Sequence, residues 1–318
     1  MTEKFKTYAE VVQACYGLPH PNEHEFAQMA APFYRFRLRE NWDDDASGNY
    51  VTVGWILLST VTNMPWTDKF KVEHHSQTVD IPYAAGEVDF ENQAIAEQLE
   101  LARAQGIFAK SKKLEDEFYR VLGVDRIVRI ARGGSGLFGI QSFGIQMTGY
   151  TFDERTGEMK IWVPKRSSTR MAHPGKMDNT VGGAANADED HFQCMLREAR
   201  EEAALPEKWL QDHAHVVGTI SYLYMRDVGA LGALNRSLQF VYDVELPSYM
   251  VPQPADDEVE EFLLWTVPET LRALKDGQFK PNSAATLIDF FIRHGYISTN
   301  DEPDLETVVS YINRRPCL

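Results

Sequence analysis

The residues that most constrain this chain are three glutamates, Glu198, Glu201 and Glu202, spaced i, i+3, i+4. On a helix this spacing places the three carboxylates on one face. Apolar residues at helical intervals predict a separate, core-facing stripe: Phe192, Met195, Leu196, Ala199 and Ala203. Because like charges on one face repel unless a cation neutralises them, we expect this helix to hold a hard divalent metal through oxygen ligands. Mg²⁺ or Mn²⁺ fits such a site, and diphosphate chemistry is its usual use.

Composition places the chain among acidic globular proteins. Its 318 residues suffice for two ordinary domains, and a formal net charge of −15 argues against nucleic acid or an anionic membrane as a partner. No run approaches the roughly 18 apolar residues of a membrane span, and the N-terminus carries no signal or transit pattern. The widely separated Cys15, Cys194 and Cys317 predict free thiols in a reducing compartment. We therefore expect a cytoplasmic enzyme that acts on a small molecule.

The first 140 or so residues alternate helical and strand-like patterns. Residues 6–15, 92–105 and 114–122 have helical composition, and the apolar residues 51–58 predict a buried strand or a short helix. Residues 132–139 are rich in glycine but lack the GxxxxGK[ST] pattern of a phosphate loop. A connection between domains is the better interpretation of that glycine cluster.

From Phe143 onward the pattern changes to strands. Residues 145–152 and 158–164 predict a hairpin around a turn at 153–157. Further strands are expected over residues 216–225, 238–246 and 258–265, with helices over 268–274 and 284–294. The acidic segment after Gly295 is expected to carry one more short helix. This order predicts a mixed sheet flanked by helices, which is an α/β fold.

The spacing around the three glutamates follows the pattern GxxxxxE-x7-REUxEE, in which U is a bulky aliphatic residue, and the chain resembles the Nudix hydrolases in this motif. The matching positions are Gly183, Glu189, Arg197, Glu198, Glu201 and Glu202. Two positions depart, because Ala199 stands at U and Ala204 replaces the glycine that follows the glutamate pair. That glycine normally ends the helix in a left-handed conformation, in which alanine costs roughly 1 kcal/mol more, so we expect Pro206 to end the helix instead.

The resemblance implies a Nudix α/β/α sandwich with a loop–helix–loop metal site. Glu198, Glu201 and Glu202 would coordinate Mg²⁺ or Mn²⁺. The carbonyl of Gly183 and the carboxylate of Glu189 would complete the shell. Arg197 would orient the glutamates by ion pairing rather than contact the substrate.

The carboxylate that removes a proton from the attacking water stays open at this stage. Glu201 or Glu198 could act as this base, and so could an acid on a distant loop. Asp257 and Glu258 are the best distant candidates, because Nudix proteins often carry an acid at the start of the corresponding strand. We favour Glu258.

Four flanking segments resemble the thiamine-diphosphokinase-related Nudix proteins: PGKMDNTVGG at 174–183, VYDVELP at 241–247, GQFKPNSAA at 277–285 and DFFIRHG at 289–295. This resemblance implies a smaller α/β N-terminal domain over residues 1–140, a Nudix domain over 141–298 and a C-terminal tail over 299–318. It also implies hydrolysis of thiamine diphosphate, or of its damaged oxo and oxy forms, to the monophosphate, as in metabolite repair. Homodimers are common for this fold, which weakly favours a dimer.

Two other functions stay open. One is a Nudix hydrolase of a nucleoside diphosphate derivative such as ADP-ribose or a dinucleotide. The other is a Nudix fold that binds a ligand without turnover. The three functions differ in their products, in their need for metal and in the effect of Glu202→Gln.

Five residues are candidates for substrate contact. Arg166, Arg170 and Lys176 form a basic cluster before the metal helix that could bind phosphate or be ordinary surface. Asn179 could contact substrate or shape its loop through side-chain hydrogen bonds. Tyr222 could stack on a heterocycle, although aromatic residues on strands more often pack in the core.

Overall fold

A mixed β-sheet forms the centre of the molecule, in a computed structural model that describes residues 4–17, 33–40, 49–82, 89–107, 117–170, 172–228 and 231–314. The strand order is β10-β11-β7-β8-β12, and β9 also pairs with β7. Among the described strands of this sheet, only the pairing of β11 with β7 is parallel. The strands are β7 (Gln141–Phe152), β8 (Met159–Arg166), β9 (Val181–Ala184), β10 (Val216–Val228), β11 (Leu231–Glu245) and β12 (Val259–Thr266).

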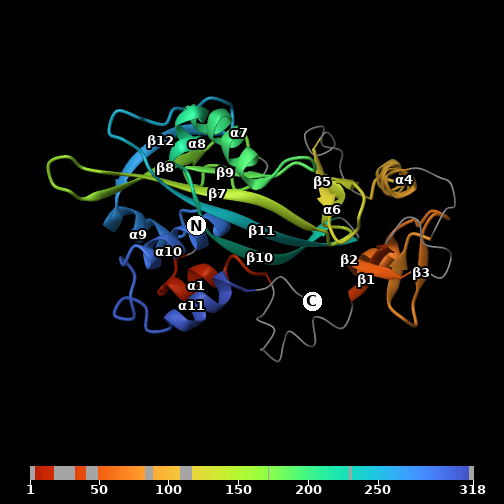
Figure 1. The fold of residues 1–318 in the computed structure, drawn as a ribbon. Coiled ribbons are helices and arrows are strands. Elements are labelled where there is room, and N and C mark those ends of the chain that lie inside the picture. Colours follow the sequence, from red (N-terminus) through yellow and green to blue (C-terminus); the bar gives the residue numbers. More distant parts are fainter. Residues whose placement is uncertain are drawn as a thin grey trace.

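Helices cover both faces of this sheet (Figure 1). One face carries α7 (His191–Ala203) and α8 (Glu207–His213), and the other carries α1 (Tyr8–Gln13), α9 (Val267–Lys275), α10 (Pro281–Arg293) and α11 (Leu305–Ile312). Because side chains alternate along a strand, each face has its own core. Ile145 and Met147 belong to the core beneath α7, whereas Ile220 and Val241 belong to the core around α10. The predicted mixed α/β fold is confirmed, and α8 is a helix that the sequence patterns did not indicate.

A second, smaller sheet lies at the far end of the long β10–β11 hairpin (Figure 1). Its order is β2-β1-β4-β3, and its core includes Leu231 and Ala233 from that hairpin. The hairpin is longer than expected, and it joins the two cores. The elements of this part are β1 (Phe33–Arg39), β2 (Tyr50–Leu57), α3 (Leu58–Asn63), β3 (Lys71–Glu73), β4 (Thr78–Asp80) and α4 (Phe90–Ala104).

A two-stranded ribbon and one helical turn link this smaller sheet to β7. They are β5 (Phe118–Val121), β6 (Val128–Ala131) and α6 (Arg132–Ser135). The helix predicted over 114–122 is wrong in its described part, because Val121 pairs with Val128 and both are buried, while residues 114–116 lie outside the described residues. The glycine cluster at 132–139 serves close packing: at Gly139, with φ of +57°, a Cβ would lie 1.9 Å from the carbonyl oxygen of Trp55.

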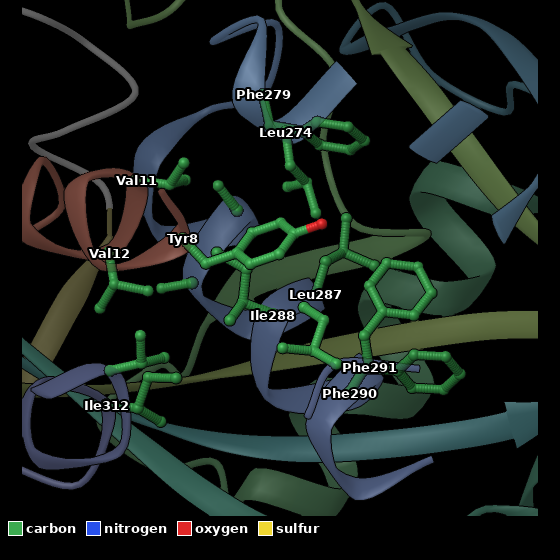
Figure 2. Close-up of a cluster of buried hydrophobic side chains, with 14 of the residues drawn as sticks. Tyr8, Val11, Val12, Leu274, Phe279, Leu287, Ile288, Phe290, Phe291 and Ile312 are labelled. Atoms are coloured by element: carbon green, nitrogen blue, oxygen red, sulfur yellow. The ribbon is translucent and has the colours of Figure 1, made fainter. Parts of the chain in front are cut away.

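The first helix does not pack with the N-terminal sheet, although it lies within the first 140 residues of the chain. Tyr8 and Val12 of α1 lie in the same core as Ile288 and Ile312 of α10 and α11 (Figure 2). The carboxylate of Glu302 fixes this arrangement by accepting hydrogen bonds from the backbone N–H groups of Tyr8 (2.6 Å) and Ala9 (3.2 Å). The short helix expected after Gly295 is confirmed as α11, and it is part of the core rather than a loose tail.

Among the residues with described positions, none of the helices is both long enough and apolar enough to cross a membrane.

Candidate active site

Helix α7 has a capping box at its start and a strained residue at its end. Asp190 accepts a hydrogen bond from the N–H of Gln193 at 2.8 Å, and the side chain of Gln193 accepts one from the N–H of Asp190 at 3.4 Å. The helix ends at Ala203, and Ala204 adopts the left-handed conformation at φ +52° and ψ +28°. Pro206 therefore does not end α7, but is the N-cap of α8. The predicted apolar stripe is confirmed for Met195, Leu196, Ala199 and Ala203, which are buried, while Phe192 is partly buried and packs against the same core.

The three glutamates of α7 differ in their surroundings. Glu202 is buried, with 8% of its surface exposed, and accepts a hydrogen bond from the backbone N–H of Gly182 at 3.0 Å. Glu198 lies directly over Gly183, where an added Cβ would be only 2.0 Å from the Glu198 Oε1 atom. Glu201 is more open, with 43% of its side chain exposed, and its Oε1 atom is 3.1 Å from Arg200. Glu198 and Glu202 thus form the inner part of the site.

The glycine pair on β9 corrects the predicted backbone ligand. The carbonyl oxygen of Gly183 would lie 2.3 Å from a Cβ added at Gly144, so this oxygen points into the sheet. The N–H of Gly182 points instead to Glu202. Because the N–H and C=O of one residue in an antiparallel pair point to the same side, the carbonyl of Gly182 faces the glutamates. Gly182 was missed because the motif marks only Gly183, and strand register decides which carbonyl faces outward.

Arg197 holds three acids in place. It forms a two-pronged ion pair with Glu189, with distances of 2.7 and 2.9 Å. Its Nη1 atom is 2.8 Å from Glu198 and 3.3 Å from Glu201, and its Nη2 atom donates to the carbonyl of Ala184 at 3.2 Å. Through these contacts Arg197 can hold the carboxylates of Glu189, Glu198 and Glu201 in fixed orientations. Both carboxylate oxygens of Glu189 are bonded to Arg197.

Glu258 lies at the start of β12, and its charge acts on the inner glutamates. Burial raises the pKa of Glu202 well above its ordinary value, and the charges of Glu198 and Glu258 add to this effect. Burial also raises the pKa of Glu198 against the opposing charge of Arg197, with Glu258 again contributing. Glu258 forms an ion pair with Arg170. The structure therefore brings this distant acid to the α7 glutamates, whereas Asp257 is exposed.

The donor set has the chemistry of a site for a hard divalent cation. Glu202 is a buried carboxylate whose one hydrogen bond comes from a backbone N–H, and it has no ion pair within the described part of the chain. A cation would offset the cost of burying this charge. In the same described residues, no three His, Cys, Asp or Glu side chains already converge on a metal position. Arg197 lies between Glu198 and Glu201, so these side chains would have to turn to share an ion.

The basic residues before α7 are engaged in the loop itself. Arg166 is buried, pairs with Asp178 at 2.5 Å, and donates to the carbonyls of Ala172 (3.0 Å) and His173 (3.2 Å). Asp178 also accepts hydrogen bonds from Ser283 and Lys280, which ties the loop to α10. The Nζ atom of Lys176 donates to the carbonyl of Gly277. These contacts give Arg166 and Lys176 structural roles, and substrate contact by either residue stays a prediction.

Asn179 is a residue of this loop, whereas Tyr222 lies on β10. Asn179 is buried and donates to the side chain of Gln146 at 2.8 Å, while its Oδ1 atom has no hydrogen-bond partner among the described residues. Tyr222 packs against the core around α10, with its ring 6.1 Å from that of Tyr224. Burial raises the pKa of Tyr222. Tyr222 is partly core, as the sequence allowed, and Asn179 retains an acceptor that a ligand could use.

A cavity of about 520 Å³ opens between the β5 ribbon and the loop that leads into α7. Tyr119 and Arg120 of β5 form one wall, and residues 185–190 form the opposite wall. Glu189 belongs to this lining, so the cavity begins beside the acids held by Arg197. No pattern in the sequence indicated that the β5 ribbon and this loop are neighbours, because β5 lies about 70 residues before α7 in the chain.

Comparison with known proteins agrees with this geometry. The NUDIX domain model matches residues 147–287. An uncharacterized protein of Saccharomyces cerevisiae is 29% identical over 83% of this chain and 80% of its own length. Of the Arabidopsis thaliana relatives, Nudix hydrolase 20, chloroplastic, is 33% identical over 58% of this chain and 48% of its own length. Nudix hydrolase 24, chloroplastic, is 29% identical over 73% of this chain and 62% of its own length.

The chain thus spans less than two thirds of either plant relative, and the match covers the acids of α7, the glycine pair and Glu258. The chain therefore carries a NUDIX domain over residues 147–287 and is similar in this part to the two plant Nudix hydrolases.

Proposed function

We propose that the protein is a Mg²⁺- or Mn²⁺-dependent diphosphatase that cleaves thiamine diphosphate, or its damaged oxo and oxy analogues, to the monophosphate and phosphate. The observation that carries the diphosphatase part is the buried carboxylate of Glu202. It lies beside Glu198 and the backbone of Gly182, and no cation pairs with it within the described residues. Such a buried charge is costly unless a cation joins it. The thiamine part rests on the resemblance of the four flanking segments.

Each acid of the site has a role in this proposal. Glu198, Glu202 and the Gly182 carbonyl would hold the metal, which supplies charge neutralisation at the diphosphate oxygens and a more acidic bound water. Arg197 keeps Glu198 and Glu189 oriented through its ion pairs. Glu258, held by Arg170, would accept the proton of the attacking water. Glu201 is more exposed and would serve as an outer ligand or an alternative base.

Substrate turnover tests the proposal directly. The protein is incubated with thiamine diphosphate, oxythiamine diphosphate, ADP-ribose or a deoxynucleoside triphosphate, with Mg²⁺ or with chelator, and the products are separated by chromatography. We expect thiamine monophosphate or its oxy analogue, and only with the metal. If AMP released from ADP-ribose were the only product, ADP-ribose would replace thiamine diphosphate as the proposed substrate. Ligand binding without any turnover in the presence of metal would favour the silent binding protein.

A pair of variants separates loss of chemistry from loss of fold. Glu202→Gln removes the inner carboxylate charge while keeping nearly the same shape, and we expect it to lower kcat by at least about 100-fold. Glu207→Gln makes the same chemical change at an exposed position in α8, where Glu207 approaches Arg200 at 4.0 Å and accepts a hydrogen bond from Gln211 at 3.4 Å. It should leave turnover unchanged. Equal activity of the two variants would remove Glu202 from the mechanism.

We also propose a cytoplasmic homodimer with no nucleic-acid or membrane partner. The acidic net charge of −15 supports the absence of nucleic acid from this list. Light scattering after size-exclusion chromatography tests the dimer, and cell fractionation tests the location. A monomer, or a membrane-bound fraction, would overturn the respective part.

A further inference from the structure

Four cations beside the acid cluster of the NUDIX domain pair with acids, whereas Lys176 donates to the carbonyl of Gly277. Arg197 pairs with Glu189 and Glu198, and Arg170 pairs with Glu258. Arg166 and Lys280 share Asp178. A diphosphate brings several further negative charges, which need positive charge or hydrogen-bond donors of their own. Donors for the substrate should therefore be sought beyond these residues.

Arg132 is an arginine of the β5–β6–α6 segment and lies outside the matched residues 147–287. It is the first residue of α6, and its backbone N–H donates to the carbonyl of Glu117 at 2.8 Å. Its Nη1 atom pairs with the Glu117 carboxylate, and 34% of its side chain is exposed. Burial alone would lower the pKa of Arg132, but the charges of Tyr119, Glu117 and Glu198 raise it above its ordinary value. Arg132 therefore lies within electrostatic reach of the inner glutamate.

The β5–β6 ribbon, which leads directly into α6 and Arg132, contacts the NUDIX domain at the loop that leads into α7. Arg129 of β6 forms a two-pronged ion pair with Asp188, with both distances 2.8 Å, in the loop that leads into α7. Tyr119 of β5 lines the 520 Å³ cavity together with Glu189. A Cβ added at Gly136 would lie 3.0 Å from the side-chain oxygen of Asn235 on β11, so α6 also packs closely on the central sheet. Arg132 is thus presented by a docked element.

The guanidinium of Arg132 has capacity for a phosphate. Its ion pair with Glu117 uses Nη1, and Nε and Nη2 have no partner among the residues that the structure describes. A guanidinium offers parallel N–H groups in a fixed fork that matches two oxygens of a phosphate. Arg166, by comparison, is buried with all three nitrogens bonded inside its own loop. Arg132 is the better placed of the two for a ligand that enters from solvent.

We propose that Arg132 of the N-terminal part binds the diphosphate group of the substrate beside Glu198, so that the phosphate site is completed from outside the NUDIX domain. This inference rests on the proposed diphosphatase function. It gives the N-terminal part a direct role in substrate binding. It also makes the β5–β6–α6 segment part of the active site rather than a linker.

The test measures binding of methylene diphosphonate, a diphosphate that cannot be hydrolysed, to the full chain by calorimetry in the presence of Mg²⁺. Arg132→Gln removes the positive charge and the parallel N–H groups of the guanidinium, and we expect the affinity for the phosphonate to fall about tenfold or more. Arg132→Lys keeps the charge and loses the fork, so we expect an intermediate fall. The matched control is Arg155→Gln, the same chemical change in the exposed turn between β7 and β8, at the opposite end of β7 from α6, and its affinity should stay within about twofold of wild type. Mg²⁺ binding without phosphonate should be equal in all four proteins.

Equal affinity of Arg132→Gln and Arg155→Gln for the phosphonate would overturn the inference. If Arg132→Gln does not fold, judged by circular dichroism, then Arg132→Lys decides, and wild-type affinity in that variant would refute the two-pronged contact. Turnover separates this inference from the proposed function. A wild-type protein that hydrolyses no diphosphate, yet binds phosphonate through Arg132, would refute the function and keep the inference. Turnover that does not depend on Arg132 would do the reverse.

Discussion

The end of α7 stores a strain that one substitution should release. Ala204 follows the last helical residue at φ +52° and ψ +28°, where the Cβ of an L-residue approaches the following carbonyl. A residue other than glycine pays roughly 1–2 kcal/mol in this conformation, and glycine pays almost nothing. Ala204 is exposed, so replacing its methyl group removes no core packing. Ala204→Gly should therefore stabilise the protein.

The size of the gain follows from two opposing terms. Relief of the left-handed strain contributes roughly 1–2 kcal/mol, whereas the greater freedom of glycine in the unfolded chain costs roughly 0.5–1 kcal/mol. The net expectation is a rise of about 0.5–1 kcal/mol in the free energy of unfolding. For 318 residues, an unfolding entropy of about 2.1 cal/mol/K per residue makes the corresponding shift in Tm only about 0.7–1.5 °C. Chemical denaturation is the better assay.

Urea unfolding followed by tryptophan fluorescence measures this gain, because Trp209 lies in α8 directly after the strained residue. The midpoint should rise with an unchanged m-value, which reports a change in stability rather than in compactness. The control is Ala96→Gly at an exposed position inside α4, where glycine should cost about 1 kcal/mol. If Ala204→Gly destabilised the protein as Ala96→Gly does, the strain argument would be refuted. Turnover should not change, because the substitution does not touch the acids.

Three further results are expected. Gly183→Ala should abolish most turnover while the fold persists, because the new Cβ would lie 2.0 Å from Glu198 Oε1 and displace that carboxylate; normal kcat would contradict this. Asp178→Asn should cost about 3–5 kcal/mol in urea at pH 7, since it leaves the buried charge of Arg166 unpaired. Although burial opposes it, the charges of nearby cations lower the pKa of Asp178 below 3.8, so its stabilisation is present above that pH and is lost as the pH falls through the lowered pKa. The deficit of the variant should shrink at acid pH, and a constant deficit would argue against the ion pair. Mg²⁺ should raise the Tm of the wild type, chelator should reverse this, and Glu202→Gln should show little response; an equal response in Glu202→Gln would exclude Glu202 as a ligand.

The sequence predicted local elements well where a single period dominated. The stripe from Phe192 to Ala203 repeats at helical spacing, and α7 forms there with its apolar side buried. The hairpin of β7 and β8 follows from two strand patterns around a turn. The prediction at residues 114–122 failed because Val121 and its neighbours gain their pairing from β6, a contact that helical composition does not report. Ala204 shows a related limit of prediction from sequence. Alanine disfavours the left-handed conformation, but Ala204 adopts it because tertiary packing holds α7 and α8 in place.

The sequence alone determined the amphipathic helix, its cluster of acids and the mixed α/β class, because spacing along the chain sets which side chains share a face. Only the tertiary structure decided which of these acids are buried. It turned the carbonyl of Gly182, rather than that of Gly183, toward Glu202 through strand register. It also brought Glu258 and Arg132 to α7 from about 60 residues away on either side. Such long-range neighbours depend on how the sheets and the β5–β6 ribbon dock, and no local period in the sequence encodes that docking.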